Sequence, residues 1–96
     1  MREATIEQRF RLAVKSRGGL CLKLTTPGFT GIPDRLNLLP GGRLFFAEFK
    51  YARNKLSARQ QTVIHVLRGL GFAVYVIDQT NIDEHIKKLD ECIKPL

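Results

Sequence analysis

The sequence contains few cysteines, few acidic residues and no long hydrophobic run, and each of these scarcities limits what the protein can be. The two cysteines, Cys21 and Cys92, stand far apart in apolar surroundings, without the spacing of a metal-binding or redox motif. We interpret them as reduced core residues and expect a cytoplasmic protein. The charged N-terminus lacks the apolar core of a signal peptide, and no run approaches the length of a membrane span.

Internal repeats, low-complexity tracts and linker-like segments are also missing from the sequence. A chain of 96 residues can bury one core without disulfides or structural metals. We therefore expect a single domain over residues 1–96.

Acidic residues are especially scarce before the C-terminal segment. Up to Ile77 the sequence has 13 Lys and Arg residues but only four acids, Glu3, Glu7, Asp34 and Glu48. The formal net charge of +7 therefore arises in a region whose composition suits a phosphate-binding surface. A merely soluble basic protein would have the same balance, so charge alone leaves both interpretations open.

Two of these acids belong to a predicted β-hairpin. Residues 36–39 form an apolar run, residues 40–42 read Pro-Gly-Gly, and residues 43–51 are rich in strand-forming side chains. A three-residue loop at positions 40–42 sets the antiparallel register. This register pairs Leu39 with Arg43, Leu38 with Leu44, Leu36 with Phe46, and Asp34 with Glu48. Lys50 joins the face of Glu48, because successive side chains of a strand alternate.

The predicted pairing brings the Cβ atoms of Asp34 and Glu48 to about 4.5–5.5 Å from each other. Two carboxylates that close repel by roughly 4 kcal/mol at an effective dielectric of about 20. A divalent cation would explain the arrangement, since Mg²⁺ commonly binds one or two carboxylates and completes its shell with water and substrate phosphates. The simpler interpretation is a loop acid after a proline and a solvent-exposed Glu-x-Lys pair on a strand.

Pro33-Asp34 followed by Glu48-Phe49-Lys50 resembles the PD-(D/E)xK nuclease signature. Within that superfamily, residues 31–36 (Gly-Ile-Pro-Asp-Arg-Leu) and 56–60 (Leu-Ser-Ala-Arg-Gln) are similar to the VRR-NUC family, the virus-type replication-repair nucleases. The resemblance is to the short stand-alone form found in phages, for which the host cytoplasm is the expected location. It covers nearly the whole chain, and Ala58, where the family often has proline, still suits a helix start.

The first predicted helix places Glu7 beside its buried face. Residues 5–8 (Thr-Ile-Glu-Gln) read as a capping box, and Gly18-Gly19 ends the helix. The apolar stripe comprises Ile6, Phe10, Ala13 and Val14. Glu7 borders this stripe and needs a partner there, unless it only complements the helix dipole. The resemblance implies that Glu7 belongs to the site and reaches the metal directly or through water.

The second predicted helix begins at another capping box, residues 57–60 (Ser-Ala-Arg-Gln). It is expected to bury Val63, Ile64, Val66, Leu67 and Leu70 and to end at Gly71. Gln60 lies on the buried stripe, whereas His65 points away from it. Capping alone accounts for Gln60, but its direction and the resemblance suggest that it also holds a water on the metal or a phosphate.

The remaining segments complete an α/β fold. Strands are expected over residues 20–24 and 72–77, the second buried on both faces. A last helix, capped at residues 81–84, points Ile82, Ile86, Leu89 and Ile93 inward and His85 outward, and ends at Pro95. A strand, a helix and a strand in succession call for a right-handed crossover and a parallel pair. The order matches the restriction-endonuclease-like αβββαβ core that the resemblance implies: a four-stranded mixed sheet flanked by helices, plus a C-terminal helix.

The resemblance also implies a cofactor and a set of catalytic residues. Mg²⁺ or Mn²⁺ would be bound by Asp34, Glu48 and the backbone carbonyl of Phe49, with Glu7 completing the shell or holding a second ion. Lys50 would orient or deprotonate the attacking water, and orientation is the simpler role for an ammonium group. No organic cofactor is expected.

Basic side chains near these positions are candidate contacts to a DNA backbone. They are Arg35, Arg53, Lys55, Arg59 and Lys23, the last of which could equally shield a strand edge. Contacts to phosphate carry no base identity, and the sequence has no recognisable reading helix. We therefore expect the protein to select DNA by shape.

Together these patterns predict a metal-dependent, structure-specific DNA endonuclease that acts on branched DNA such as flaps or four-way junctions, in replication, recombination or repair. A two-fold junction needs two cuts and the chain carries one site, so a homodimer is expected. Three alternatives stay open: a non-catalytic nucleic-acid-binding module, a sequence-specific restriction-type nuclease and a structural subunit of a phage particle. Metal dependence, the fragments cut from linear duplex and salt-sensitive DNA affinity distinguish them.

Overall fold

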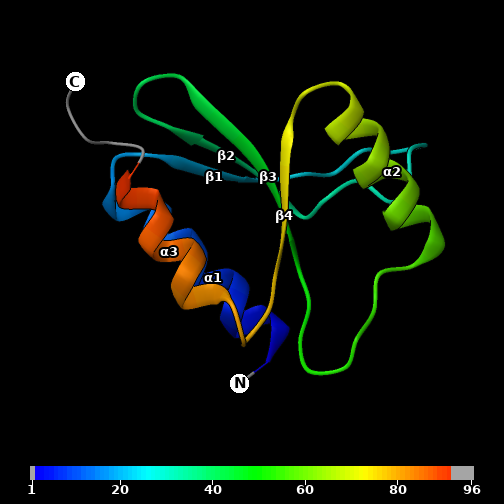
Figure 1. The fold of residues 1–96 in the computed structure, drawn as a ribbon, viewed down its shortest axis with the longest axis horizontal. Coiled ribbons are helices and arrows are strands. Elements are labelled where there is room, and N and C mark those ends of the chain that lie inside the picture. Colours follow the sequence, from blue (N-terminus) through cyan, green and yellow to red (C-terminus); the bar gives the residue numbers. More distant parts are fainter. Residues whose placement is uncertain (1, 92–96) are drawn as a thin grey trace.

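The computed structural model describes residues 2–91, and within them three helices enclose a four-stranded sheet. The elements are α1 (Glu3–Ser16), β1 (Leu20–Lys23), β2 (Arg35–Leu39), β3 (Arg43–Phe49), α2 (Ala58–Gly69), β4 (Ala73–Ile77) and α3 (Ile82–Glu91). The strand order is β1-β2-β3-β4, with β3 and β4 parallel and the other neighbours antiparallel. Helices α1 and α3 lie together on one side of the sheet and α2 on the other (Figure 1). The predicted α/β fold class is confirmed.

The central hairpin has the predicted register. Leu39 pairs with Arg43, Leu38 with Leu44, and Leu36 with Phe46. The loop between β2 and β3 needs glycine, because Gly41 and Gly42 have φ values of 83° and 77°, in the left-handed region that other residues disfavour. The last paired residues are Arg35 and Ala47, so Asp34 and Glu48 lie one position beyond them, where β2 begins.

The main core lies between the sheet and the helix pair α1–α3. Phe10 of α1 packs its ring against Phe45 and Phe49 of β3, at centroid distances of 6.0 and 5.7 Å. The predicted stripe of α1 is buried at Ile6, Phe10 and Val14, and Ala13 is partly buried. Ile82 and Leu89 bring α3 into the same core, whereas Ile93 and Pro95 fall outside the described residues. Aromatic packing on β3 thus fixes the strand that carries Glu48.

The start of α1 differs from the sequence-based expectation. The helix begins at Glu3 with Arg2 as its N-cap, and no side chain caps it, so the capping box expected at Thr5 is wrong. The backbone amides of Thr5 and Ile6 donate to the carbonyl of Arg2 instead. The helix gains a partial turn, because Glu3 suits the positive end of its dipole. Glu7 therefore sits inside the helix and not at its cap.

The face of the sheet beneath α2 is only partly covered, which corrects several burial expectations. Val63 and Ile64 are buried, but Val66 is 53% and Leu70 69% exposed. A single helix crosses this face beside β4 (Figure 1), and it cannot turn all five predicted positions inward. Leu20 and Leu22 of β1 are exposed for the same reason. Phe72 precedes β4 and is also exposed, so the last strand is less enclosed than its sequence indicates.

The histidines and the described cysteine divide between surface and core. His65 is exposed as predicted. His85 is half-buried against the ring of Tyr75, with centroids 5.0 Å apart, and burial lowers its pKa; the expectation that it faces solvent is wrong. Cys21 is free and half-buried against the core, and burial raises the pKa of its thiol. Cys92 lies outside the described residues.

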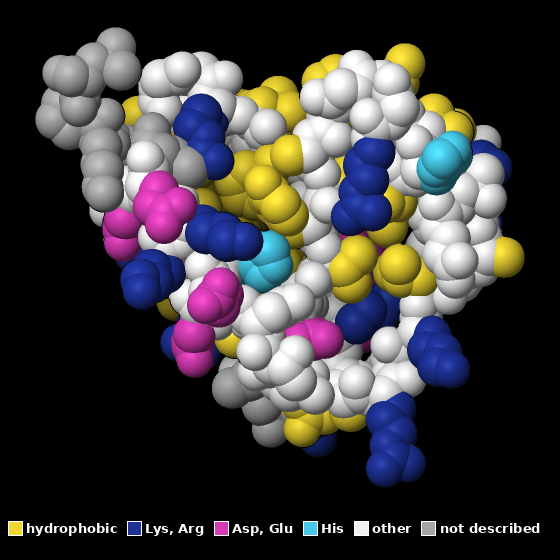
Figure 2. All heavy atoms as spheres, viewed as in Figure 1, with side chains coloured by type: hydrophobic (Ala, Val, Ile, Leu, Met, Phe, Trp, Pro, Cys, Tyr) yellow, Lys and Arg dark blue, Asp and Glu magenta, His cyan; other side chains and the backbone are white. Residues whose placement is uncertain are grey.

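Charges are unevenly distributed over the surface. Acidic side chains gather over α3 in the view of Figure 2, while Lys and Arg protrude at the lower right. On α3, Asp83 pairs with Arg9 of α1, and Asp90 pairs with Arg17, the residue directly after α1. These exposed pairs contribute little stability, but they neutralise α1 and leave the positive surplus elsewhere. No helix among residues 2–91 is long and apolar enough to cross a membrane.

Candidate active site

Asp34 lies at the point where β2 and β3 begin to separate. Its carboxylate Oδ2 accepts a hydrogen bond of 2.9 Å from the backbone N–H of Phe49, and its backbone carbonyl accepts one from Leu24. Burial raises the pKa of Asp34 above its usual range; the Phe49 hydrogen bond opposes this shift and the negative charge of Glu7 adds to it. The Asp34 carboxylate is therefore fixed in position, and its charged form is destabilised by burial and by the nearby negative charge.

Glu48 is the most deeply buried acid of the described chain, with only 2% of its surface exposed. Its Oε2 accepts a hydrogen bond of 3.1 Å from Gln60 and lies 3.5 Å from the Lys50 ammonium. Its Oε1 is buried without a partner among the described residues. Burial, reinforced by the charge of Asp34, raises the pKa of Glu48 to about 7. An unsatisfied carboxylate oxygen in a negative setting is a position where a cation would stabilise the protein.

The backbone carbonyl of Phe49 points to the side of β3 on which Asp34 lies. In an extended strand the N–H and C=O of one residue point to the same side, and the N–H of Phe49 points to Asp34. Extending the Arg35–Ala47 pairing by two residues puts buried Pro33 opposite Phe49. Proline has no N–H, so Pro33 cannot donate a hydrogen bond to the Phe49 carbonyl. The Pro-Asp sequence thus leaves this oxygen available as a ligand.

Lys50 continues β3 by one residue and completes the cluster. Its backbone N–H donates to the carbonyl of Ile77 in β4 at 2.9 Å, which fixes the end of the strand. Its side chain is only 17% exposed and lies beside Glu48. The sequence-based expectation that Lys50 and Glu48 share a face is therefore confirmed.

Gln60 connects the cluster to the first turn of α2. The predicted capping box is present: the Ser57 hydroxyl accepts from the Gln60 N–H, and the Gln60 side-chain oxygen accepts from the Ser57 N–H at 2.9 Å. Because the amide oxygen is used in the cap, the amide nitrogen must point the other way, and it donates to Glu48. The same side chain caps the start of α2 and holds the buried carboxylate of Glu48.

Glu7 approaches from α1 and has a protein partner. Its Oε2 accepts a short hydrogen bond of 2.6 Å from Arg35, and both side chains are largely buried. Arg35 also donates to the carbonyl of Cys21. The structure thus gives Glu7 the partner that its half-buried position requires, and it turns Arg35 toward α1. A contact between Arg35 and DNA stays a prediction.

These groups fit a hard divalent cation. No three carboxylate, histidine or cysteine side chains within residues 2–91 come close enough to hold a metal by themselves. The site instead offers the side chains of Asp34 and Glu48 with the Phe49 carbonyl. Two carboxylates are a usual protein contribution for Mg²⁺, which takes water and phosphate oxygens for the rest. The oxygen-only donor set and the unpartnered Glu48 Oε1 both agree with such an ion.

The remaining predicted DNA contacts border this cluster on exposed segments. Arg53 and Lys55 are exposed in the loop between β3 and α2, and Lys23 is exposed at the end of β1. Ala52 takes a φ of 56° and donates its N–H to Gln79 at 2.9 Å. This left-handed turn, uncommon for a residue with a Cβ, anchors the base of the loop. The start of the loop that carries Arg53 and Lys55 is therefore fixed to the rest of the domain.

Arg59 contacts the loop over residues 25–30, between β1 and β2. Its guanidinium lies 5.0 Å from the ring centroid of Phe29, and its Nε donates to the carbonyl of Thr30. Phe29 belongs to this loop and not to a helix or strand. An aromatic residue next to Pro27-Gly28 gives no periodic signal, so the contact emerges only from the tertiary structure.

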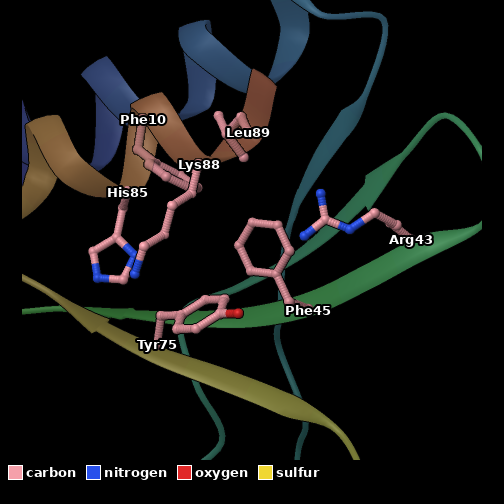
Figure 3. Close-up of a pocket in the computed structure, with 7 residues that line it drawn as sticks. All are labelled: Phe10, Arg43, Phe45, Tyr75, His85, Lys88 and Leu89. Atoms are coloured by element: carbon pink, nitrogen blue, oxygen red, sulfur yellow. The ribbon is translucent and has the colours of Figure 1, made fainter. Parts of the chain in front are cut away.

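A small cavity lies on the α1–α3 side of the sheet, and none of these carboxylates lines it. It measures about 20 Å³, room for roughly one water molecule. Figure 3 shows Arg43, His85 and Lys88 around it, together with aromatic and aliphatic side chains. Its lining contains no carboxylate, so this part of the described chain offers no comparable metal site.

A mixed sheet that carries two carboxylates and a lysine at the end of its central hairpin defines a restriction-endonuclease-like nuclease fold. A solved structure described as "VRR_NUC domain" matches with a TM-score of 0.78 and 26% identity, over 96% of this chain and 97% of that one. "Putative nuclease p44" of Acyrthosiphon pisum secondary endosymbiont phage 1 is 35% identical over 82 residues, 85% of this chain and 88% of that protein. No family model matches the sequence. The chain belongs to the VRR-NUC family of nucleases.

Proposed function

We propose that this nuclease is a Mg²⁺- or Mn²⁺-dependent endonuclease that hydrolyses phosphodiester bonds in branched DNA. The observation that supports it most is Glu48: a buried carboxylate with one unpartnered oxygen and a pKa raised to about 7, beside the carboxylate of Asp34. A purely structural hairpin gains nothing from this pair, whereas groups tuned in this way are typical of functional sites.

Asp34, Glu48 and the carbonyl of Phe49 would hold the ion. When bound, it would supply positive charge next to the scissile phosphate and lower the pKa of an attacking water. Gln60 donates to one carboxylate oxygen of Glu48 and would thereby orient that carboxylate toward the ion. Glu7, already paired with Arg35, would act through water more readily than by direct contact.

Lys50 would orient the nucleophile and stabilise charge on the phosphate. Its ammonium is largely removed from solvent and lies beside Glu48, so it is held in one region without being fully neutralised. A preorganised cation in such a setting stabilises developing negative charge more strongly than a solvated one. Orientation and charge stabilisation need no loss of the lysine proton.

Selection of branched DNA would rest on shape. Arg53, Lys55, Arg59 and Lys23, all exposed, would supply cations that contact phosphates, and such contacts carry no base identity. A four-way junction requires two symmetric cuts, so we propose that two copies act together. The exposed leucines of the uncovered sheet face, Leu20, Leu22 and Leu44, form an apolar surface of the kind found at interfaces.

Cleavage of a labelled four-way junction, a flap and a linear duplex tests the proposal. We expect cutting of branched DNA with Mg²⁺ or Mn²⁺ and none with EDTA, with paired incisions on the junction if a dimer acts. Discrete fragments from the linear duplex would indicate a sequence-specific enzyme instead. Tight, salt-sensitive binding without cutting in any metal would leave only a nucleic-acid-binding module, and absence of DNA affinity would remove both.

Gln60 allows a sharper test, because one side chain has two separable contacts. Ser57→Ala removes the cap alone and is expected to cost about 1 kcal/mol of stability with cleavage unchanged. Gln60→Ala also frees Glu48, and loss of a group that orients a metal ligand typically costs about 10–100-fold in activity or metal affinity. Urea unfolding and single-turnover cleavage measure the two effects. Equal loss of cleavage in both variants would contradict a role for Gln60 beyond capping.

A further inference from the structure

An apolar hollow lies between α2 and the loop that carries Phe29 and Ile32. Its volume is about 320 Å³, within the usual range for small-ligand sites of about 300–1,000 Å³. Phe29 and Ile32 form one wall, and Val63, Val66 and Leu70 of α2 form another. Phe29 is 47% exposed. Concave apolar surfaces of this kind are typical of binding sites.

Phe29 and Arg59 form the rim of this hollow. The Arg59 guanidinium covers one face of the Phe29 ring at 5.0 Å from its centroid. The pair combines an aromatic surface with a positive charge. Proteins that bind single-stranded nucleic acids use this combination, since bases stack on aromatic rings and cations attract the backbone.

The loop that carries Phe29 is held in place. The hydroxyl of Thr26 donates to the Phe29 carbonyl at 2.8 Å, and the N–H of Phe29 donates to the Thr26 carbonyl at 3.0 Å. Gly31 has a φ of 84°, and a Cβ at this position would lie 2.8 Å from Arg59 Cγ and 3.0 Å from its carbonyl oxygen. The loop thus packs backbone to backbone on α2, and Phe29 is presented in a preorganised position.

Two short segments of the chain connect this rim with the carboxylate cluster. Arg59 is followed directly by Gln60, which donates to Glu48. Along the chain, Asp34 follows Phe29 by five residues, which span at most about 17 Å. Nucleotides of one strand rise by about 3.4 Å each, so a base on Phe29 would lie within roughly five nucleotides of the cleaved bond.

From this geometry we propose that the Phe29–Arg59 pair is a stacking site for an unpaired base of the DNA substrate. The inference rests on the proposed nuclease function and deepens it, because a base can reach the site only where the duplex is open. Arg59 behind the ring attracts the neighbouring phosphate, and the apolar wall of α2 excludes water from the stacked base. Branched DNA would thereby be preferred over continuous duplex without any reading of sequence.

Binding measured in EDTA tests this inference apart from cleavage. The probes are a flap whose single-stranded arm carries 2-aminopurine, and a blunt duplex of the same sequence. Phe29→Leu keeps an apolar side chain but removes the ring, and Phe29→Trp keeps a ring. Phe72→Leu is the matched control, because Phe72 is 42% exposed and stands at the other end of α2.

We expect Phe29→Leu to weaken flap binding by about 5- to 150-fold, the range that corresponds to loss of one base–aromatic stack. Its duplex affinity should be unchanged, and the quenching of 2-aminopurine seen with wild type should disappear. Phe29→Trp and Phe72→Leu should retain wild-type flap affinity. Circular dichroism confirms that each variant is folded.

Two results would overturn the stacking site. One is unchanged flap affinity and unchanged quenching in Phe29→Leu. The other is a smaller particle mass by light scattering in Phe29→Leu with no selective loss of flap binding, which would make the hollow an interface between copies of this chain. Wild-type cleavage of the same flap with Mg²⁺ or Mn²⁺ is measured in parallel, so absence of cutting would count against the nuclease proposal and not against stacking.

Discussion

Replacing Lys50 with alanine is expected to reduce the rate of DNA cleavage by about 10²–10³-fold, the usual effect of removing one preorganised charge-stabilising group. The ammonium lies 3.5 Å from Glu48 Oε2, within the proposed active site. DNA affinity measured in EDTA should change little, because one largely buried cation adds little to a surface-wide electrostatic attraction. Single-turnover cleavage at saturating DNA measures the rate without the binding step.

Lys55→Ala is the matched control, since it removes the same group from the exposed loop between β3 and α2. Lys55→Ala should weaken DNA binding and lower the slope of log K against log salt concentration by about one. Its cleavage rate at saturating DNA should stay near that of wild type. If Lys50→Ala and Lys55→Ala behave alike, Lys50 is a backbone contact and the catalytic assignment fails.

The central hairpin could be predicted closely because its determinants are local. The Pro-Gly-Gly loop fixes the register, and the register then fixes which side chains oppose each other. This is why Asp34, Glu48 and Lys50 were placed together from the sequence, and why the capping box at Ser57 and Gln60 was found.

Features that depend on the packing of distant segments were harder to predict. The exposure of Val66 and Leu70 arises because one helix alone crosses its face of the sheet, and helical periodicity cannot report how many neighbours a helix has. Glu7 was correctly placed at a buried border, but its ion pair with Arg35, 28 residues away, has no local signal. The stacking of Arg59 on Phe29 is invisible to the sequence for the same reason.

The buried carboxylate at Glu48 should make the metal-free protein less stable as pH rises. Burial raises its pKa in the folded protein to about 7, from 4.5 for an unperturbed glutamate. The folded state therefore holds the proton more tightly than the unfolded state. The stability that this proton contributes is complete below pH 4.5 and is lost as pH rises through about 7. The shift corresponds to roughly 3 kcal/mol.

Glu48→Gln keeps the shape of the side chain and its acceptor for Gln60, but it carries no charge. In EDTA we expect the variant to be more stable than wild type by roughly 3 kcal/mol at pH above 7 and nearly equal to it below 4.5. Urea unfolding across this range measures the difference. Glu91→Gln, an exposed change at the end of α3, should stay within about 0.5 kcal/mol of wild type throughout.

The same substitution should abolish metal-dependent cleavage, so one carboxylate would affect both stability and function. Mg²⁺ or Mn²⁺ should raise the melting temperature of wild type, because a ligand that binds only the folded state stabilises it. It should leave Glu48→Gln unchanged. Suppose that Glu48→Gln is more stable than wild type without metal, and that metal neither stabilises it nor supports cleavage. That result would show that Glu48 serves metal binding at a cost to the stability of the fold. A variant that loses stability in EDTA at high pH would mean that Glu48 serves the fold, and the metal assignment would be wrong.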